Sequence, residues 1–455
     1  MKKSQILGIA VGATLAMGLS ASAFATDGYQ LIGIGQYAVG MAGAVVAAPD
    51  DPLSAAISNP AGLALMTPQA AFSAEIFNPT RKTNLGFGEI GSHSNVYGVP
   101  AIGWVAPAFG DGIVFGGGVY GTSGLGVNYL QNVPANPHLP YGGYAQAFSS
   151  ITFMQMAPSI AMKVNHHLAV GATLNIAAEQ ASFQQTFSQY APVIVGQTPG
   201  GVPVTSIMPV TGGLNLANPS WAYGAGFTLG MLYKVNDMVT LGLTYKSPIW
   251  FSSLNWQAGV QNQVNQTGSG VYGSPGQYSG TLNYPQQVAF GLAIRPIPQW
   301  LISVEGQWIN WASTMNNFDV SGPWNAVYHG APAGSVSSIA LPMHWKNQWV
   351  ANIGTQYDLT NWLQVRAGYT YGSNPISNNT IASNLIFPAI VQNAITFGAT
   401  QKLGMGWKLT EAYMHEFSNT NTGGISPFQQ PGQTLATPSA TLSENSYGLQ
   451  IGYEF

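Results

Sequence analysis

The sequence contains no cysteine, and this absence removes several classes of protein at once. The chain has neither a disulfide framework nor any thiol chemistry. Charge is also scarce, because Asp, Glu, Lys and Arg make up only 6% of 455 residues, against about a quarter in ordinary soluble domains. Water therefore does not solvate the whole surface of this protein.

Long apolar runs are missing as well. After residue 25 the chain has no uninterrupted apolar stretch of about 18 residues, which argues against transmembrane helices. In place of charge it has 56 Gly and many Asn, Gln, Ser and Thr residues. This composition suits strands that face lipid on one side and a neutral polar lumen on the other.

The first 25 residues have the features of an export signal. Met1-Lys2-Lys3 is a positive start, residues 6–19 are apolar, and Ala23-Phe24-Ala25 is a small-x-small cleavage site. We expect a signal peptide at residues 1–25 and a mature chain from Thr26. Without Lys2 and Lys3, 10 Lys and Arg stand against 15 Asp and Glu, a balance of about −5. Such a balance provides no electrostatic footprint for nucleic acid.

Period-two segments recur from residue 69 to the C-terminus. In residues 446–455, for example, Tyr447, Leu449 and Ile451 alternate with small or polar residues. Fourteen such segments start near residues 69, 97, 112, 150, 166, 221, 238, 283, 299, 347, 361, 391, 405 and 445. Bacterial outer-membrane barrels have an even number of strands. The sequence therefore predicts an all-β fold, a 14-stranded antiparallel transmembrane β-barrel over residues 69–455.

The connections between these segments alternate between short and long. Long loops are expected at roughly residues 79–96, 122–148, 184–220, 248–280, 312–345, 373–390 and 419–443. Short periplasmic turns and long outer loops are the usual asymmetry, which places both termini on the periplasmic side. The chain ends in Phe455, with Tyr453 two residues before it. This ending resembles the terminal aromatic signature that barrel-assembly machinery reads, although a last strand can also end in an aromatic residue by chance.

Residues 26–68 differ from the rest, because they are apolar enough to be buried yet are interrupted by glycine and proline. We expect them to form a compact irregular plug inside the barrel. Within this plug, four stretches resemble the N-terminal hatch of the FadL-type outer-membrane family. They are Gly28-Tyr29-Gln30-Leu31, Gly40-Met41-Ala42-Gly43-Ala44, Asp50-Asp51-Pro52 and Asn59-Pro60-Ala61-Gly62-Leu63.

The resemblance implies a function and a location. Members of that family take up long-chain fatty acids or, in other branches, aromatic and aliphatic hydrocarbons. It implies a passive channel, not an enzyme, in the outer membrane of a Gram-negative bacterium. The expected partners are a hydrophobic small molecule, outer-membrane lipids and, through Phe455, the assembly machinery. A monomer is expected, with no cofactor, no metal and no nucleic acid.

Several hatch residues are candidates for gating. Asp51 is placed to cap a short helix that has Pro52 at its first position, and Asn59-Pro60 can start a second turn in the same way. The resemblance further implies that Asn59 ties the hatch to the barrel wall. Tyr29, Leu31, Pro60 and Ala61 belong to the same set. Alternatively, these residues only form tight turns inside a buried plug.

Gly116-Gly117-Gly118 lies within the third predicted strand, and consecutive glycines mark bulges or kinks. The resemblance implies that a kink here makes a side window, through which an apolar ligand leaves laterally into the bilayer. An apolar ligand gains about 0.8 kcal/mol per buried methylene, so a dry sideways route keeps this gain. Alternatively, the glycines only make room for the hatch.

The resemblance also indicates where a ligand would bind. Fatty-acid members place basic groups near the ligand carboxylate, and here Lys246 and Arg366 are candidates, unless they form ion pairs with Glu305 or Glu411. The loops at 122–148 and 184–220 are expected to collect ligand on the outside. Their candidate contact residues are Leu125, Tyr129, Leu130, Phe183 and Phe187.

Two rival classes stay open at this stage. An outer-membrane lipid or ester hydrolase needs a nucleophile beside a base, and His415 is the histidine well inside a predicted strand. The sequence offers no partner for it. An adhesin or porin-like protein would lack the plug or would line its lumen with rings of charge, and neither feature is present in the sequence.

Overall fold

The computed structural model describes residues 27–110, 112–136, 139–258, 276–323, 335–429, 432 and 434–455. The expected signal peptide, residues 1–25, lies outside the described residues, as does Thr26.

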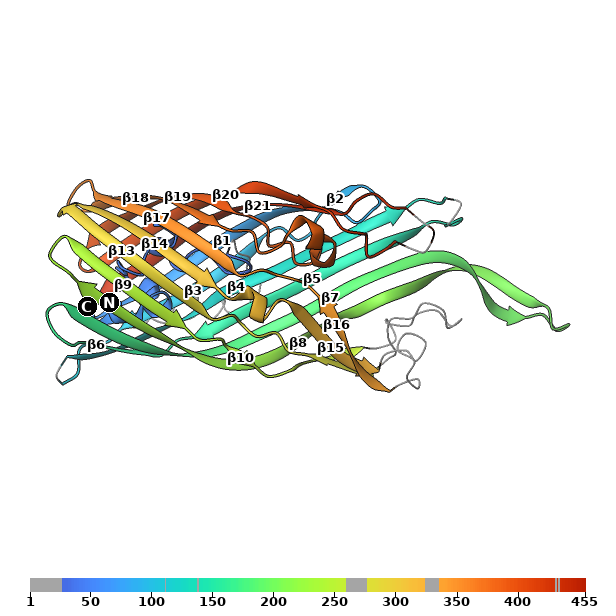
Figure 1. Ribbon diagram of the computed structural model, residues 1–455, viewed down its shortest axis with the longest axis horizontal. Helices are drawn as coiled ribbons and strands as arrows, with labels where there is room; N and C mark the ends of the chain where they lie inside the picture. The colour runs from blue at the N-terminus through green and yellow to red at the C-terminus, as the bar shows by residue number, and fades with distance from the viewer. Residues whose placement is uncertain are drawn as a thin grey trace, which may run out of the picture.

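A closed wall of antiparallel strands makes up most of the molecule (Figure 1). The wall closes where β1 pairs with β21, from Gln69 opposite Glu454 to Asn84 opposite Ser439. β5 and β6 act as one wall strand, because both pair with β4 and β7 on either side of Ala157 and Pro158. The predicted all-β, 14-stranded antiparallel barrel is confirmed. Its strands are β1 (Gln69–Asn84), β3 (Tyr97–Val105), β4 (Ile113–Val133), β5 (Gly143–Met156) with β6 (Ser159–Lys163), β7 (Leu168–Gln197), β8 (Pro203–Lys234), β9 (Val239–Lys246), β13 (Gln287–Ile297), β14 (Trp300–Ile309), β17 (Gln348–Asp358), β18 (Leu363–Gly372), β19 (Asn393–Gly404), β20 (Trp407–Thr422) and β21 (Ser439–Glu454).

Shorter elements lie at the barrel end opposite the C-terminus or inside the barrel. β2 (Glu89–Gly91) pairs with β1, and β10 (Trp250–Phe251) pairs with β8. A second sheet contains β11 (Leu254–Ala258), β12 (Gly276–Gly280), β15 (Asn317–Pro323) and β16 (Val336–Pro342). The short helices are α2 (Gln36–Gly40), α3 (Pro52–Ile57), η1 (Pro60–Leu65), η3 (Trp311–Ser313) and η4 (Asn378–Asn384). None of the helices in the described residues is both long and apolar enough to cross a membrane.

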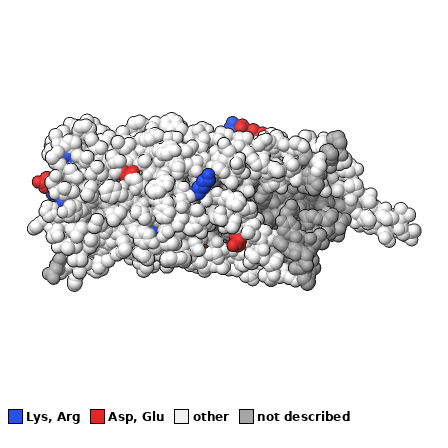
Figure 2. Space-filling model, viewed as in Figure 1, with Lys and Arg blue, Asp and Glu red and all other residues white. Residues whose placement is uncertain are grey.

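The two faces of the wall differ in the way that the period-two pattern predicts. On β21, Tyr447, Leu449 and Ile451 are exposed on the outside, whereas Ser446 and Gln450 are buried on the inside. The outer face is almost free of charge in the view of Figure 2. An apolar outer face suits lipid, and the inner face carries the polar groups that contact the hatch.

Two expected loops are wrong, because strand pairing continues through them. β4 and β5 cover most of 122–148, and their pairing extends to Val133 opposite Gly143. β7 and β8 cover most of 184–220, and their pairing extends to Gln197 opposite Pro203. This hairpin projects beyond the rest of the molecule, whereas the C-terminus lies at the barrel end with the short turns (Figure 1). Both stretches lack charge and keep alternating β-formers, so they continue as strands past the point where composition suggests loops.

Candidate functional site

The hatch, defined here as residues 27–68, is held on the inner wall by polar contacts. The side chain of Gln36 donates to Ser73 on β1 at 3.1 Å, and its backbone N–H donates to Gln450 on β21 at 2.8 Å. Glu305 on β14 accepts from the backbone N–H groups of Val45 at 3.1 Å and Val46 at 3.0 Å. Hydrogen bonds to a buried carboxylate are stronger than neutral ones. The hatch is therefore anchored to strands on several sides of the lumen.

The predicted caps are present in the hatch. The side chain of Asp51 accepts from Ser54 N at 2.8 Å, and Pro52 occupies the first position of α3. Asn59 caps η1 by accepting from Ala61 N at 3.2 Å.

Asn59 also joins the hatch to the wall. Its amide Nδ2 donates to Val46 O inside the hatch at 2.7 Å and to Met231 O on β8 at 3.0 Å. A Cβ on Gly171 of β7 would lie 2.5 Å from the carbonyl carbon of Pro60, so only glycine lets the hatch approach so closely. Whether these contacts open during transport stays a prediction.

Strand pairing is interrupted along the edge of β4 that faces β3. β3 and β4 pair from Val105 opposite Gly116 to Ala101 opposite Tyr120, and no further register pair joins these two described strands. Beyond Tyr120, the hatch takes the place of β3. Gln30 forms an antiparallel bridge with Ser123, Leu31 N donates to Thr122 O at 3.3 Å, and Gly124 N donates to Tyr29 O at 3.2 Å.

The three glycines of the predicted kink lie just before this interruption. They still pair with β3, and they allow close contacts on both sides. A Cβ on Gly117 would lie 2.6 Å from Ala157 O and 3.1 Å from the ring of Trp104, and one on Gly116 would lie 3.0 Å from Leu63 of the hatch. The glycines thus make room for the hatch and for neighbouring strands, while β3 and β4 separate from Gly121 onward.

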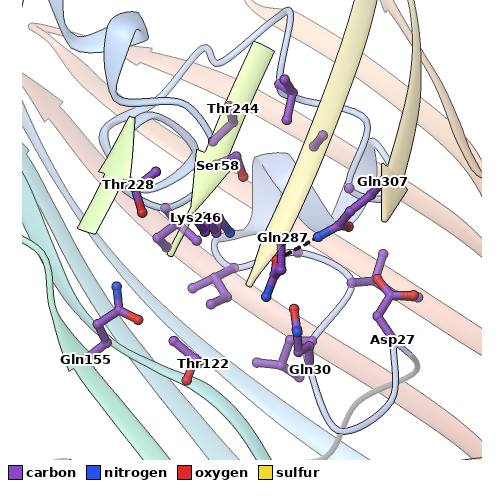
Figure 3. Close-up of a pocket in the computed structure, with 18 of the residues that line it drawn as sticks. Asp27, Gln30, Ser58, Thr122, Gln155, Thr228, Thr244, Lys246, Gln287 and Gln307 are labelled. Atoms are coloured by element: carbon purple, nitrogen blue, oxygen red, sulfur yellow. Dashed lines mark hydrogen bonds between the residues drawn. The ribbon is translucent and has the colours of Figure 1, made fainter. Parts of the chain in front are cut away.

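A cavity of about 80 Å³ lies between the hatch and the wall (Figure 3). Its lining is mostly polar and includes Asp27, Gln30, Lys246, Gln287 and Glu305. Burial raises the pKa of Asp27 to about 7 from 3.8. Lys246, a predicted carboxylate partner, lines this cavity, and its contact with a ligand stays a prediction.

Arg366, the second predicted partner, is committed to other groups. Its guanidinium donates to Gln356 at 2.7 Å, Thr400 at 2.8 Å and Gln364 at 3.2 Å, and it lies 4.7 Å from the centre of the Tyr37 ring. These neighbours are neutral, so the arginine braces the hatch helix α2 from the wall. Glu305, one of the two acids expected to pair with it, instead binds backbone N–H groups of the hatch.

Aromatic rings surround Tyr29, and we call this group the aromatic cage. Tyr29 stacks on Phe153 at 5.3 Å between ring centres and lies 4.4 Å from Trp311, 5.8 Å from Tyr284 and 5.9 Å from Trp345. Each indole N–H is satisfied, Trp311 by Gln348 at 3.0 Å and Trp345 by Asn384 at 2.7 Å. The cage is therefore an apolar compartment of the lumen, and it adjoins the cavity through Tyr284.

The sequence did not indicate that these two tryptophans pack around Tyr29. Trp311 and Trp345 stand near strand ends, which suggests the membrane interface, but the turns at η3 and after β16 direct both rings inward, where they are buried. From the sequence, Glu305 is expected only as an ion-pair partner. Its parity on β14, opposite to that of the exposed Val304, was the available signal for a lumenal role.

The five predicted ligand contacts do not all face the lumen. Leu125, Tyr129 and Phe183 are buried, and Phe187 packs on Phe87 at 6.0 Å and on Phe428 at 6.3 Å. Leu130 is 48% exposed on the outer face, and its expected contact with a ligand at the outer surface stays a prediction. Neighbouring residues of a strand point to opposite sides, so Tyr129 and Leu130 cannot both face inward.

The hydrolase alternative gains no nucleophile from the contacts of His415. Its Nδ1 lies 2.9 Å from Asn445 Oδ1, and its ring packs edge-on against Phe417, which is exposed on the outer face. Ser446, the next residue on β21, points into the lumen and donates to Glu75. Within the described ranges, no group of three His, Cys, Asp or Glu residues is placed to hold a metal ion.

Comparison with known proteins gives a consistent result. A family model described as "Outer membrane protein transport protein (OMPP1/FadL/TodX)" matches residues 12–422. A curated relative, the long-chain fatty acid transport protein of Escherichia coli O6:H1, is 22% identical over 231 residues. That alignment covers 47% of this chain and 48% of the relative, about half its length.

Solved structures share the fold over nearly the whole chain. A FadL homologue of Pseudomonas aeruginosa has a TM-score of 0.68 at 18% identity, with 94% of this chain and 100% of that one covered. The toluene transporter TbuX of Ralstonia pickettii has a TM-score of 0.63 at 19% identity, covering 93% and 99%. The toluene transporter TodX of Pseudomonas putida has a TM-score of 0.65 at 19% identity, covering 94% and 100%.

Proposed function

The chain belongs to the outer membrane protein transport protein family (OMPP1/FadL/TodX), and on that premise we propose that it is a passive channel for hydrophobic small molecules. The ligand enters from the outer loops, passes through the lumen beside the hatch, and leaves sideways into the bilayer. Relatives named for toluene and for long-chain fatty acids support the substrate class: hydrocarbons, aromatic compounds or fatty acids.

One observation carries the lateral route. The edge of β4 from Thr122 to Gly124 has the hatch segment 29–31 bonded to it where β3 would otherwise continue. Three residues on two main-chain hydrogen bonds are a weaker seal than a wall strand, because each such bond contributes only about 0.5–1.5 kcal/mol. Withdrawal of this segment would open the wall between β3 and β4 at the level of the cavity and the aromatic cage.

The proposed channel assigns a role to each part of the chain. Residues 1–25 would direct export and be removed, residues 26–68 would act as the hatch, and residues 69–455 would form the transmembrane barrel in contact with outer-membrane lipids. Phe455 is 76% exposed, so its ring is available to the barrel-assembly machinery. The wall closes where β1 pairs with β21, so the barrel needs no second chain to complete it, which supports a monomer.

Uptake by cells tests this function directly. Cells that express the chain should accumulate labelled toluene or labelled oleate faster than cells that lack it, at equal barrel content in the outer membrane. If oleate is carried with its carboxylate near Lys246, Lys246→Met should slow oleate more than toluene. Equal uptake with and without the protein, for every apolar compound tried, would refute the proposed function.

A further inference from the structure

Glu179 is the one Asp, Glu, Lys or Arg residue between Lys163 and Lys234, a span that contains nearly all of β7 and β8. It lies in the middle of β7, opposite Phe153 on β5 and Ala222 on β8. Directly paired residues of neighbouring strands point to the same face, so the carboxyl group stands beside the Phe153 ring that stacks on Tyr29. An isolated acidic group on this inner face needs an explanation.

The carboxyl group of Glu179 is buried and unpaired. Its side chain is 0% exposed, and neither carboxyl oxygen has a hydrogen-bond partner among the described residues. Its register partners Phe153 and Ala222 are both apolar and buried. Leaving a buried carboxyl group without a partner is costly, whereas an apolar residue of similar size would cost nothing of this kind.

A second unpaired polar atom lies in the same compartment. The hydroxyl of Tyr29 also has no partner among the described residues, although its ring is fully enclosed. Burial, with smaller contributions from Tyr284 and Glu179, raises the pKa of this phenol, so it remains a neutral donor. A donor on Tyr29 and an acceptor on Glu179 are thus both buried without a partner, while backbone bonds hold residues 29–31 against β4.

From these contacts we propose that Glu179 determines specificity, by accepting a hydrogen bond from an O–H or N–H group on an aromatic ligand whose ring takes the place of Tyr29 in the aromatic cage when the hatch segment 29–31 withdraws. The ligand class is a neutral monocyclic aromatic compound with a hydrogen-bond donor, such as a phenol or an aryl amine. This inference rests on the proposed function and narrows its substrate class. Unlike Tyr29, a free ligand can turn its donor toward the carboxyl group.

Matched ligands in binding experiments on the purified full-length protein test the inference. Ethylbenzene, 4-ethylphenol and 4-ethylaniline have similar size and differ in the donor. The unmodified protein should bind 4-ethylphenol and 4-ethylaniline about tenfold more tightly than ethylbenzene. This is the usual gain in affinity from one hydrogen bond to a charged or strongly polar group. Glu179→Leu should remove this preference without weakening ethylbenzene binding, and Glu179→Gln, which keeps an acceptor oxygen, should retain part of it.

A matched control separates recognition from a general effect on the barrel. Gln180→Leu changes the next residue, on the opposite face of β7, and should leave the preference unchanged. Equal affinity for all three ligands in the unmodified protein would overturn the role of Glu179, and so would the same loss of preference in Gln180→Leu. In either case, uptake of toluene by cells would still support the proposed channel. If cells with the unmodified protein take up no apolar compound, both the proposed channel function and the role of Glu179 are overturned.

Discussion

The carboxylate of Glu305 accepts a hydrogen bond from the backbone N–H of Val46, 3.0 Å away, although the two residues are 259 positions apart in the chain. The same oxygen accepts from Val45 at 3.1 Å. One wall residue therefore satisfies two consecutive backbone donors of the hatch. Such donors otherwise need water or another acceptor when they are buried.

Replacing Glu305 should loosen the hatch in a graded way. Glu305→Leu leaves both N–H groups without their acceptor, which should cost on the order of 2–4 kcal/mol of local stability, whereas Glu305→Gln keeps an oxygen and should cost about 1 kcal/mol. The measurement is hydrogen-exchange protection of residues 41–48, together with ion conductance in planar bilayers. The exposed Glu89, which pairs with Lys82 at 3.0 Å, supplies the control variant Glu89→Gln. Unchanged protection in Glu305→Leu would contradict this anchoring role.

Gln30 and Ser123 offer a direct test of the lateral exit. They are bridge partners that are not hydrogen-bonded to each other, since the bonds run through their neighbours. In such pairs the Cα atoms are about 4.5 Å apart, within the range that a disulfide spans. The chain has no cysteine, so Gln30→Cys with Ser123→Cys creates a unique pair.

Oxidation of this double variant should stop uptake of toluene, and reductant should restore it, because the disulfide holds the hatch segment on β4. Each single-cysteine variant, treated in the same way, should transport normally and serves as the control. Full uptake with the disulfide formed would place the exit elsewhere in the wall.

The glycine triplet makes a separate prediction about assembly. Gly117→Ala should destabilise the barrel by about 1–3 kcal/mol, because its Cβ would meet Ala157 O at 2.6 Å and overpacking is costly. Gly98→Ala on β3 is the matched control, since nothing lies within 4 Å of its added Cβ. The temperature at which the folded band is lost in gel electrophoresis measures the difference. Equal temperatures for the two variants would argue against this packing.

The sequence predicted the barrel well because a strand between lipid and a lumen must alternate residue by residue, as Tyr447 to Ile451 do on β21. The caps at Asp51 and Asn59 could be predicted equally well, since a cap depends on residues close in sequence. Contacts between segments far apart in the chain could not be predicted from the sequence. No local pattern pairs Gln30 with Ser123 or brings Trp311 and Trp345 around Tyr29. The lone charge of Glu179 was visible in the sequence, but its neighbours were not.

The N-terminal segment of the hatch should respond to pH through Asp27. Burial raises the pKa of this carboxyl group from 3.8 to about 7, and Lys246, Glu305 and Tyr284 line the same cavity. A raised pKa means that the seated segment binds a proton more tightly than the released one. The free energy that seats residues 27–31 is therefore greatest below about pH 4, falls as the pH rises to about 7, and is constant above that value.

Hydrogen-exchange protection of residues 28–31, corrected for intrinsic exchange rates, should accordingly be higher at pH 5 than at pH 8. Asp27→Asn has no titrating group at this position, so its protection should be the same at both values and close to the level that the unmodified protein reaches below about pH 4. The double-cysteine variant, oxidised, gives the fully seated reference at each pH. A pH dependence that persists in Asp27→Asn would assign the effect to Glu305 or Lys246 instead, because these are the other charged groups that line the cavity.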